Sequence, residues 1–355
     1  MKVNLLLNAN NRAWIIQKIA ERFRDQLPAF GAEATITESV DASADVVHHM
    51  SWAFAEQTPQ PSTMFITHLD DPLKMQEARA RLRRDVRLGI CMSRDTMQQL
   101  IDHGCPPSSV YFIGPAHDGL ARPRRIVLGL TTRLYPDGRK REALLHEIAE
   151  RMDLSPFEFQ IFGIGWERTA ERLRAAGALV HDHGESDDYR KDYQAILEAL
   201  PRFDYYLYLG LDEGSLGTLD ALAAGVPTIV TPQGFHLDLP GGITHAVLTA
   251  DDLQRVLTDI AAAKQTLWKA VEQLTWTTFV QRHAEVWRAL LAGAPLPALP
   301  EVAVSGTETT AALDAERRRL MAANALSPRR ILASISRLPA FRALRREVDK
   351  RRLKH

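Results

Sequence analysis

The sequence predicts an α/β protein in which two parallel-sheet domains follow one another along the chain. Residues 203–231 show an apolar strand, a loop, a helix and a second strand, which is the crossover unit of a parallel sheet. Residues 2–8 and 126–130 each open a further series of apolar strands and helical patterns. A chain of 355 residues is long enough for two domains with separate cores.

In the first half, the strand at residues 2–8 precedes a helix over 14–30 with an apolar face. Further strands are expected at residues 45–50, 63–67 and 86–93. A helix over 94–103 should end at Gly104, because glycine suits the left-handed conformation that follows many helices. His48 and His49 lie within a strand pattern, so we expect structural roles for them.

In the second half, strands and helices alternate from residue 126 onward. Strands are expected at 126–130, 159–165, 203–209 and 228–231, and helices at 142–152, 166–176, 189–199, 216–224 and 251–267. A last helix over 274–291 carries Phe279, Val280, Val286 and Leu290 as core candidates. This order again predicts a parallel sheet with crossover helices.

Composition excludes several classes of protein. The formal net charge is zero, which gives no indication of nucleic-acid binding. The two cysteines, Cys91 and Cys105, have no metal-site spacing and suit a reducing compartment. No apolar run has the roughly 20 residues of a membrane span, and the first residues lack a signal-peptide pattern. We therefore expect a cytoplasmic protein.

The loop before the helix at 216–224 has the composition of an anion site. Gly214 and Gly217 leave backbone N–H groups accessible, and the helix dipole favours negative charge at this end. Asp212 and Asp220 bracket the turn, one in the loop and one in the helix. Both carboxylates are therefore expected to face the same crevice.

This stretch resembles the donor-site signature of retaining glycosyltransferases with the GT-B fold, family 4 in particular. Asp212 and Asp220 fall on the two acid positions of that signature, and residues 219–227, LDALAAGVP, match the helix and strand that follow. The family usually carries Glu at both positions, so Glu213 is an alternative for the first acid. Residues 104–118 resemble the end of the first domain in this family, and residues 159–165 resemble a later strand. The resemblance covers residues 1–292 and implies two Rossmann-like domains facing a cleft.

The resemblance also implies roles for individual residues. Arg133 matches a cation that holds the donor diphosphate, and either Arg139 or Lys140 matches the second. Asp220 would hold the ribose, Asp212 or Glu213 would meet the donor sugar, and Gly214, Ser215 and Leu216 would offer backbone amides. His68 ends a strand and is followed by Asp70, so it is expected on the acceptor side. In the first loop, residues 8–12, this chain lacks the glycines that many family members carry.

The activity implied is transfer of a sugar, with retention, from a nucleotide-sugar donor to a glycan or lipid-linked acceptor. Bacterial cell-surface polysaccharide or glycolipid synthesis is the expected setting. No cofactor and no obligatory metal are expected, because no Asp-x-Asp metal motif is evident and His181 and His183 lack a third ligand. Two alternatives stay open: a sugar-phosphate transferase or phosphorylase-like enzyme, and a degenerate nucleotide-sugar-binding or scaffold protein of the same fold.

The expected domains are an acceptor domain at 1–121, a donor-nucleotide domain at 122–274, a closing helix at 275–292, a linker at 293–326 and a tail at 327–355. The tail contains ten Lys and Arg residues against Glu347 and Asp349, a net charge of +8. Ile331, Ile335 and Leu338 are among its apolar residues at helical spacing. Such a basic amphipathic segment indicates an anionic membrane surface, and hence a peripheral location. Packing on an acidic face of this chain or of a second subunit is the alternative.

Overall fold

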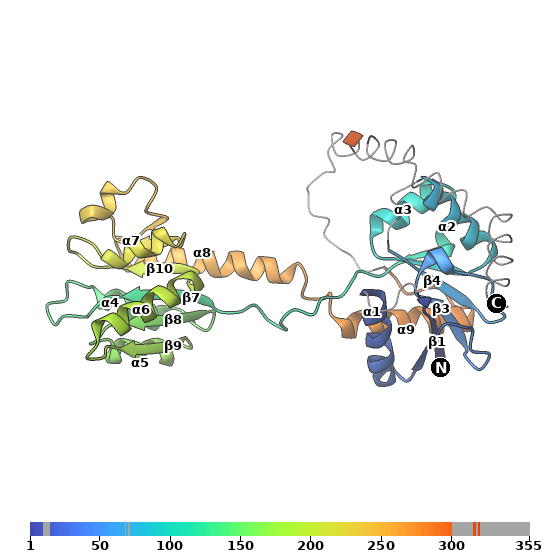
Figure 1. The fold of residues 1–355 in the computed structure, drawn as a ribbon, viewed down its shortest axis with the longest axis horizontal. Coiled ribbons are helices and arrows are strands. Elements are labelled where there is room, and N and C mark those ends of the chain that lie inside the picture. Colours follow the sequence, from blue (N-terminus) through green and yellow to red (C-terminus); the bar gives the residue numbers. More distant parts are fainter. Residues whose placement is uncertain (10–14, 68, 70–71, 300–314, 317–318, 320–355) are drawn as a thin grey trace, which may run out of the picture. The chain divides into compact units, whose positions relative to one another are not determined.

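The structure is a computed structural model of the 355-residue chain, in which residues 1–9, 15–67, 69, 72–299, 315–316 and 319 are described (Figure 1). Two compact units are present: the first contains Met1–His117 and α9 (Trp276–Ala292), and the second is Asp118–Gln273. Each unit has a six-stranded sheet, and all strand pairs are parallel. The predicted fold class, two Rossmann-like α/β domains, is confirmed. The predicted tail at 327–355 lies outside the described residues.

The sheet of the first unit has the strand order β2-β1-β3-β4-β5-β6. Its strands are β1 (Lys2–Leu6), β2 (Glu33–Thr37), β3 (Val46–His49), β4 (Ser62–Ile66), β5 (Leu88–Cys91) and β6 (Val110–Phe112). Helices α1 (Ile15–Gln26) and α9 pack on one face, where Phe23 and Phe279 lie in one core cluster. Helices α2 (Pro72–Arg84) and α3 (Arg94–Asp102) cover the other face through Met75 and Leu100. Both faces are apolar, as parallel sheets require.

Three histidines, His48, His49 and His283, are buried in the first unit. His48 is buried beside Trp287 of α9, and its Nδ1 is 2.7 Å from Thr63 Oγ1. His283 of α9 is also buried, and its Nδ1 donates to the Phe279 carbonyl at 2.8 Å. Trp287 Nε1 donates to Thr63 Oγ1 at 3.1 Å. The contacts of Trp287 with His48 and Thr63 fix α9 against the sheet of the first unit.

The sheet of the second unit has the order β12-β11-β10-β7-β8-β9. Its strands are β7 (Ile126–Thr131), β8 (Phe157–Phe162), β9 (Leu179–Gly184), β10 (Tyr205–Tyr208), β11 (Thr228–Val230) and β12 (His245–Ala246). Its helices are α4 (Glu142–Arg151), α5 (Glu167–Ala175), α6 (Tyr189–Ala199), α7 (Leu216–Ala223) and α8 (Ala250–Lys269). Helices α4, α5 and α8 share one core cluster with the sheet, whereas α7 and the end of α6 pack in a second cluster.

The strand order places a switch point between β7 and β10. From β7 the chain passes to β8 and β9 on one side, and then crosses back to β10, β11 and β12 on the other. In open α/β sheets, ligands bind in the crevice at the carboxyl ends of the strands on either side of such a point. The loops after β7 and β10 are therefore where the topology favours a binding site. None of the helices in the described ranges has the length and apolar character needed to cross a bilayer.

Candidate functional site

The loops after β7 and β10 meet at the carboxyl edge of the second sheet. The Leu211 amide donates to the Arg139 carbonyl at 2.8 Å, which joins the two loops. Next to this bond, Lys140 Nζ donates to Asp212 Oδ2 and to the Tyr208 hydroxyl, each at 2.7 Å. The Lys140 side chain is only 9% exposed and that of Asp212 is 23% exposed. A shielded ion pair thus lies at the switch point.

Asp212 is ionised in this arrangement. Its carboxylate also accepts hydrogen bonds from the Tyr208 hydroxyl and from the Gly214 amide. Burial by itself raises the pKa of Asp212, but the hydrogen bonds from Lys140 and Tyr208 outweigh it and hold the pKa below its ordinary value. Burial and the neighbouring Asp212 carboxylate raise the pKa of Tyr208. At neutral pH Asp212 is therefore a carboxylate and Tyr208 a neutral phenol.

Glycines of this loop are required by contacts within the protein. A Cβ at Gly217 would lie 2.1 Å from Thr131 Oγ1 and 2.4 Å from the Tyr206 hydroxyl. The Tyr206 hydroxyl is 2.8 Å from both Thr131 Oγ1 and Ser215 Oγ, so it links the end of β7 to the start of α7. Gly214 has a φ of +109°, which favours glycine. These positions bring the N-terminus of α7 close to the loop after β7.

His236 is a buried part of the site to which the sequence analysis assigned no role. Its Nδ1 lies 3.0 Å from the Thr231 carbonyl, which can only accept, so Nδ1 carries the proton. Its Nε2 then accepts from the Ser215 amide at 3.3 Å and from Thr218 Oγ1 at 3.0 Å. His236 thereby holds the first turn of α7. Because histidine is polar and follows Gly234 in a loop pattern, no local signal indicates its burial.

The three predicted backbone amides differ in their hydrogen bonds. The Gly214 amide donates to Asp212 and the Ser215 amide to His236. Leu216 opens α7 with its side chain 73% exposed. The amides of a first helical turn have no partner within the helix. Leu216 is therefore the amide of the three that stands at the open end of the helix.

The predicted cations also differ in position. Arg139 lies over the Tyr135 ring, with its guanidinium carbon 4.2 Å from the centroid, and pairs with Asp137 at 3.5 Å. Lys140, not Arg139, contacts Asp212. Arg133 follows β7 and its Nε lies 2.7 Å from Glu185 Oε1, with 58% of the Arg133 side chain exposed. Hydrogen bonding to Glu185 raises the pKa of Arg133.

Arg141 is a further cation that the sequence analysis assigned no role. It has a φ of 53° at the N-cap of α4, and its guanidinium donates to Thr231 Oγ1 at 3.3 Å and to the Leu248 carbonyl. Arg141 therefore ties the start of α4 to the carboxyl end of β11. This contact fixes the loop that carries Lys140.

The two remaining acids have different surroundings. Asp220, in α7, accepts a hydrogen bond from the Tyr193 hydroxyl of α6, with its nearer oxygen at 3.2 Å. The Asp220 carboxylate raises the pKa of Tyr193. The backbone carbonyl of Glu213 accepts a hydrogen bond from the Phe235 amide at 3.1 Å, and Glu213 is exposed. Asp212 is thus the acid that points inward to Lys140.

Some predicted residues cannot be placed. His68 and residues 10–12 of the first loop lie outside the described residues. Among the described residues, no group of three or more His, Cys, Asp or Glu side chains could hold a metal ion. His183 Nε2 instead lies 2.7 Å from Gln160 Oε1, and His181 Nε2 lies 3.5 Å from Glu158 Oε1. The expectation that catalysis needs no metal stays a prediction.

Comparison with known proteins gives matches only among solved structures. No protein-family model and no curated protein matches the chain. The lipopolysaccharide outer core galactosyltransferase WaaB, in its apo form, aligns with 12% identity and a TM-score of 0.34 over 82% of this chain and 99% of that chain. Anabaena Alr3699/HepE in complex with UDP and glucose aligns with 13% identity and a TM-score of 0.30, over 82% of this chain and 98% of that chain. AviGT4, a glycosyltransferase involved in avilamycin A biosynthesis, gives 18% identity and a TM-score of 0.30, over 83% and 99% of the two chains.

Proposed function

We propose that the protein is a glycosyltransferase that moves a sugar from a nucleotide-sugar donor to a glycan or lipid-linked acceptor, with retention of configuration. One observation carries the proposal: Lys140 is fixed by Asp212 and Tyr208 at the switch point of the second sheet, beside the N-terminus of α7. A fixed ammonium and a helix N-terminus together favour a phosphate group at this edge.

The chemistry follows from the hydrogen-bond count at Lys140. An ammonium has three N–H donors, and Asp212 and Tyr208 accept two of them. Among the described residues no acceptor takes the third N–H, which is therefore open to a diphosphate oxygen. When the bond between sugar and diphosphate breaks, negative charge grows on the leaving group, and a cation already in place stabilises it more than the ground state. Lys140 would therefore bind the leaving group, while Asp212 and Tyr208 position Lys140.

The other residues complete the proposed donor site. Arg133 and the Leu216 amide would add contacts to the diphosphate, and Asp220 would accept hydrogen bonds from the ribose hydroxyls. Retention fits a short-lived ion pair in which the departing diphosphate helps to deprotonate the acceptor on the same face. His68 is assigned to the acceptor side. Residues 327–355 would hold the protein at an anionic membrane, which suits a lipid-linked acceptor and a peripheral cytoplasmic location.

Thermal unfolding in the presence of UDP, GDP, ADP and dTDP, with and without attached sugars, tests the proposal. A ligand at 100 times its dissociation constant adds about 2.7 kcal/mol to the free energy of unfolding. We expect one base to raise the melting temperature of the wild type and to have a much smaller effect on Lys140→Ala. Lys269→Ala, which removes an exposed lysine at the end of α8, is the matched control. Absence of a shift with every nucleotide contradicts the proposed function.

One feature favours a second candidate, a nucleotide-sugar-binding protein without turnover. The Asp212 carboxylate is engaged by Lys140, Tyr208 and the Gly214 amide, so its capacity to meet a donor sugar is reduced. Slow hydrolysis of the bound donor in the absence of acceptor distinguishes the two functions. A transferase is expected to hydrolyse its donor, whereas a pure binding protein would shift its melting temperature with the same ligand and release no free sugar.

A further inference from the structure

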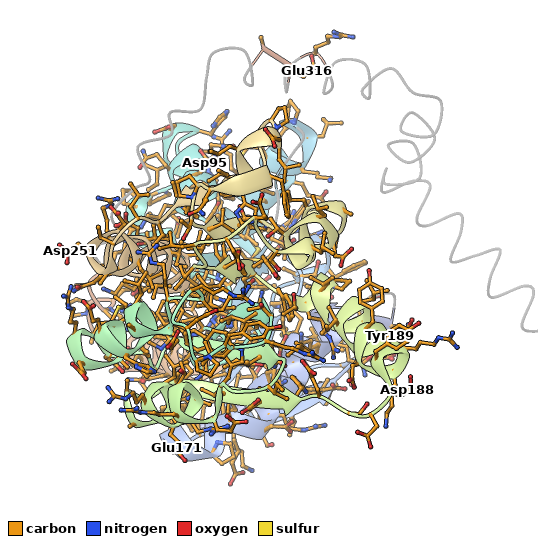
Figure 2. All side chains as sticks on the ribbon, turned by 90° about the vertical axis from the view of Figure 1, so that its left-hand side faces the viewer. Asp95, Glu171, Asp188, Tyr189, Asp251 and Glu316 are labelled. Atoms are coloured by element: carbon orange, nitrogen blue, oxygen red, sulfur yellow. The ribbon has the colours of Figure 1, made fainter. Side chains whose placement is uncertain are left out.

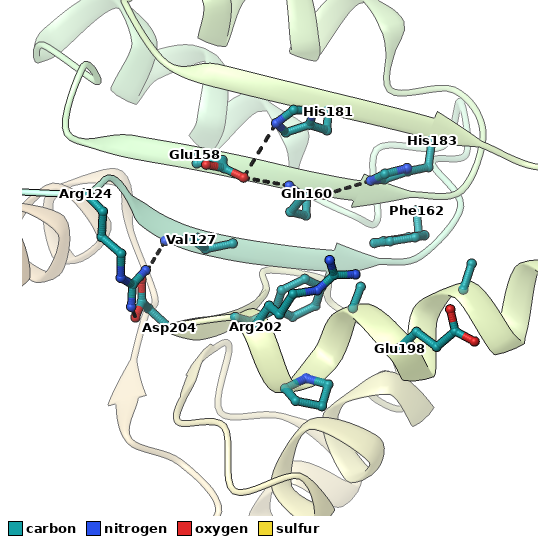
Figure 3. A pocket seen from close by; sticks show the side chains of 14 residues that line it. Arg124, Val127, Glu158, Gln160, Phe162, His181, His183, Glu198, Arg202 and Asp204 are labelled. Carbon is teal, nitrogen blue, oxygen red and sulfur yellow. Dashed lines mark hydrogen bonds and ion pairs between the residues drawn. The ribbon is translucent and has the colours of Figure 1, made fainter.

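A pocket of about 760 Å³ opens on the face of the second sheet, between strands β8 and β9 and the end of α6 (Figure 3). The strands contribute four polar side chains to its wall: Glu158, Gln160, His181 and His183. Glu198 of α6 and Arg202 just beyond it contribute two charged side chains from the opposite side. The volume lies within the range of about 300–1,000 Å³ that is usual for ligand pockets.

The pocket exists because this face of the sheet is polar. Along β8, Phe157, Phe159 and Ile161 are fully buried in the core cluster, while the intervening Glu158 and Gln160 turn to the opposite face. Parallel sheets are ordinarily apolar on both faces because helices cover them. Burying these polar groups under an apolar helix would cost free energy unless each found a partner. This face therefore favours a polar ligand or water over an apolar cover.

Helix α6 leaves the pocket open. Toward the pocket it presents the small side chains Ala195 and Ala199. Its Tyr189 is 73% exposed, and Figure 2 shows Tyr189 projecting from the surface at the start of the helix. Apart from Glu198, the α6 residues that line the pocket are thus small.

Hydrogen bonds between the strands fix the polar wall before any ligand arrives. His183 Nε2 donates to Gln160 Oε1 at 2.7 Å, and Gln160 Nε2 donates to Glu158 Oε1 at 2.7 Å. The His183 ring stacks on Phe162 with centroids 4.2 Å apart and 12° between planes, which fixes its orientation. Within the described part of the chain, this relay uses one N–H of Gln160 and one oxygen of Glu158. The second N–H, the second oxygen and His183 Nδ1 remain for a ligand.

The charges of the pocket select against charged ligands. An anion would face the carboxylates of Glu158 and Glu198, and a cation would face Arg202. At the far end, Arg124 and Asp204 neutralise each other through two hydrogen bonds of 2.7 and 2.6 Å. Burial and the nearby His181 lower the pKa of His183, which keeps that ring neutral at neutral pH. A neutral ligand with many hydroxyl groups can both donate to and accept from such a wall.

We propose that this pocket binds a neutral saccharide of one or two sugar residues. The pocket is distinct from the proposed donor site, because Lys140, Asp212 and Asp220 are not among the residues that line it. It extends from Arg124 and Asp204, which precede β7 and β10, to Phe162 and His183 near the ends of β8 and β9. The proposal rests on the lining of the pocket and does not depend on the proposed glycosyltransferase activity.

The test measures binding of lactose, maltose, cellobiose and N-acetylglucosamine to the full chain by saturation-transfer NMR and calorimetry. Ala195→Trp, on the exposed helix, fills the pocket from one side, and His183→Ala removes a polar group from the other. We expect at least one neutral sugar to bind, and both variants to weaken its binding tenfold or more. His103→Ala, an exposed histidine at the end of α3, is the matched control and should bind as the wild type does. Melting temperatures of all variants show whether the fold is retained.

Several outcomes would overturn the proposal. One is that no neutral sugar binds; another is that inorganic phosphate, glucuronic acid or glucosamine binds at this pocket and the neutral sugars do not. A third is sugar binding that survives in both pocket variants but is lost in Asp220→Ala, since this would assign the sugar to the donor edge. Because nucleotide binding is measured separately, failure here leaves the proposed function untouched, and loss of nucleotide binding leaves this proposal untouched.

Discussion

Lys140 and Asp212 are 72 positions apart in the sequence, yet Lys140 Nζ lies 2.7 Å from Asp212 Oδ2. The contact joins the loop after β7 to the loop after β10. The switch point of the strand order lies between these two strands. Tyr208, the last residue of β10, contacts both members of the pair. The three side chains therefore place one cation where the topology favours a ligand.

Replacement of Lys140 by Met should lower both stability and nucleotide binding. Methionine keeps most of the aliphatic side chain but leaves the Asp212 carboxylate without its cation. Hydrogen bonds to charged groups contribute about 1.5–3 kcal/mol each, so we expect the free energy of unfolding to fall by about this amount. Chemical unfolding and calorimetry with the preferred nucleoside diphosphate measure the two effects. Undiminished nucleotide affinity in a folded variant would show that Lys140 does not contact the diphosphate.

The adjacent acids Asp212 and Glu213 should respond differently to the same change. Asp212→Asn removes the charge that pairs with Lys140, whereas Glu213 is exposed and no such pair holds it among the described residues. We expect Asp212→Asn to reduce donor hydrolysis at least tenfold and Glu213→Gln to have less than a twofold effect. Initial rates at saturating donor provide the comparison. The reverse order would make Glu213 the first acid of the site.

Asp220 should be needed for nucleosides but not for inorganic diphosphate. Its carboxylate is oriented by the Tyr193 hydroxyl at 3.2 Å from the nearer oxygen. Asp220→Ala is expected to weaken nucleotide binding tenfold or more, and Tyr193→Phe to weaken it by a smaller factor, because the acid loses its orientation but not its charge. Calorimetry with the nucleotide and with inorganic diphosphate separates the ribose contact from the phosphate contact. Unchanged nucleotide affinity in Asp220→Ala would rule out the ribose role.

Buried histidines should make the first unit sensitive to acid. Burial lowers the pKa of His283 to about 3. Burial and the nearby Arg81 lower the pKa of His49 to about 4. Burial also lowers the pKa of His48 well below its usual value. The pKa of a histidine in the unfolded chain is about 6.5. At pH values between about 6.5 and the lower pKa values of the folded chain, these histidines bind protons in the unfolded chain but not in the folded chain. The free energy of unfolding should therefore fall as pH drops below about 6.5, by up to about 1.4 kcal/mol per pH unit for each histidine.

Urea unfolding at a series of pH values tests this dependence. His283→Gln, which retains a polar side chain without the titration, should reduce the slope below pH 6.5. His103→Ala, at an exposed histidine, should leave it unchanged. A slope that is the same in all three proteins would assign the acid sensitivity to other groups.

Sequence analysis predicts the elements that have a clear local pattern and misses those that lack one. Helix α6 occupies the predicted residues 189–199, because a local apolar pattern and a capping Asp188 determine it. Strands β2 and β9 and helix α2 were not predicted. Both strands lie at a sheet edge and are partly exposed, which removes the continuous apolar run of a buried strand. Helix α2 has a weak apolar face among many arginines.

In the candidate site, too, local signals could be predicted from the sequence, whereas contacts between distant residues could not. Asp212, Lys140 and Asp220 could be named from their resemblance to a known signature, but nothing local pairs Lys140 with a residue 72 positions away. Tyr208, Tyr193, Arg141 and His236 were assigned no role in the site, because their importance lies in contacts formed only after the strands assemble. Tyr208 resembles any apolar strand residue in the sequence, and its hydroxyl acquires a role only because Lys140 and Asp212 lie beside it.

Removal of residues 327–355 should abolish binding to anionic vesicles. This segment carries a net charge of +8, and each cation near an anionic surface contributes on the order of 1 kcal/mol. We expect the full chain to sediment with vesicles that contain phosphatidylglycerol at low salt, and to be released as salt screens the charges. Vesicles of phosphatidylcholine alone are the control, and neither form of the protein should bind them. If the truncated protein sediments with anionic vesicles as well as the full chain does, the segment is not the membrane contact, and its charge must serve a contact within this chain or with a second subunit.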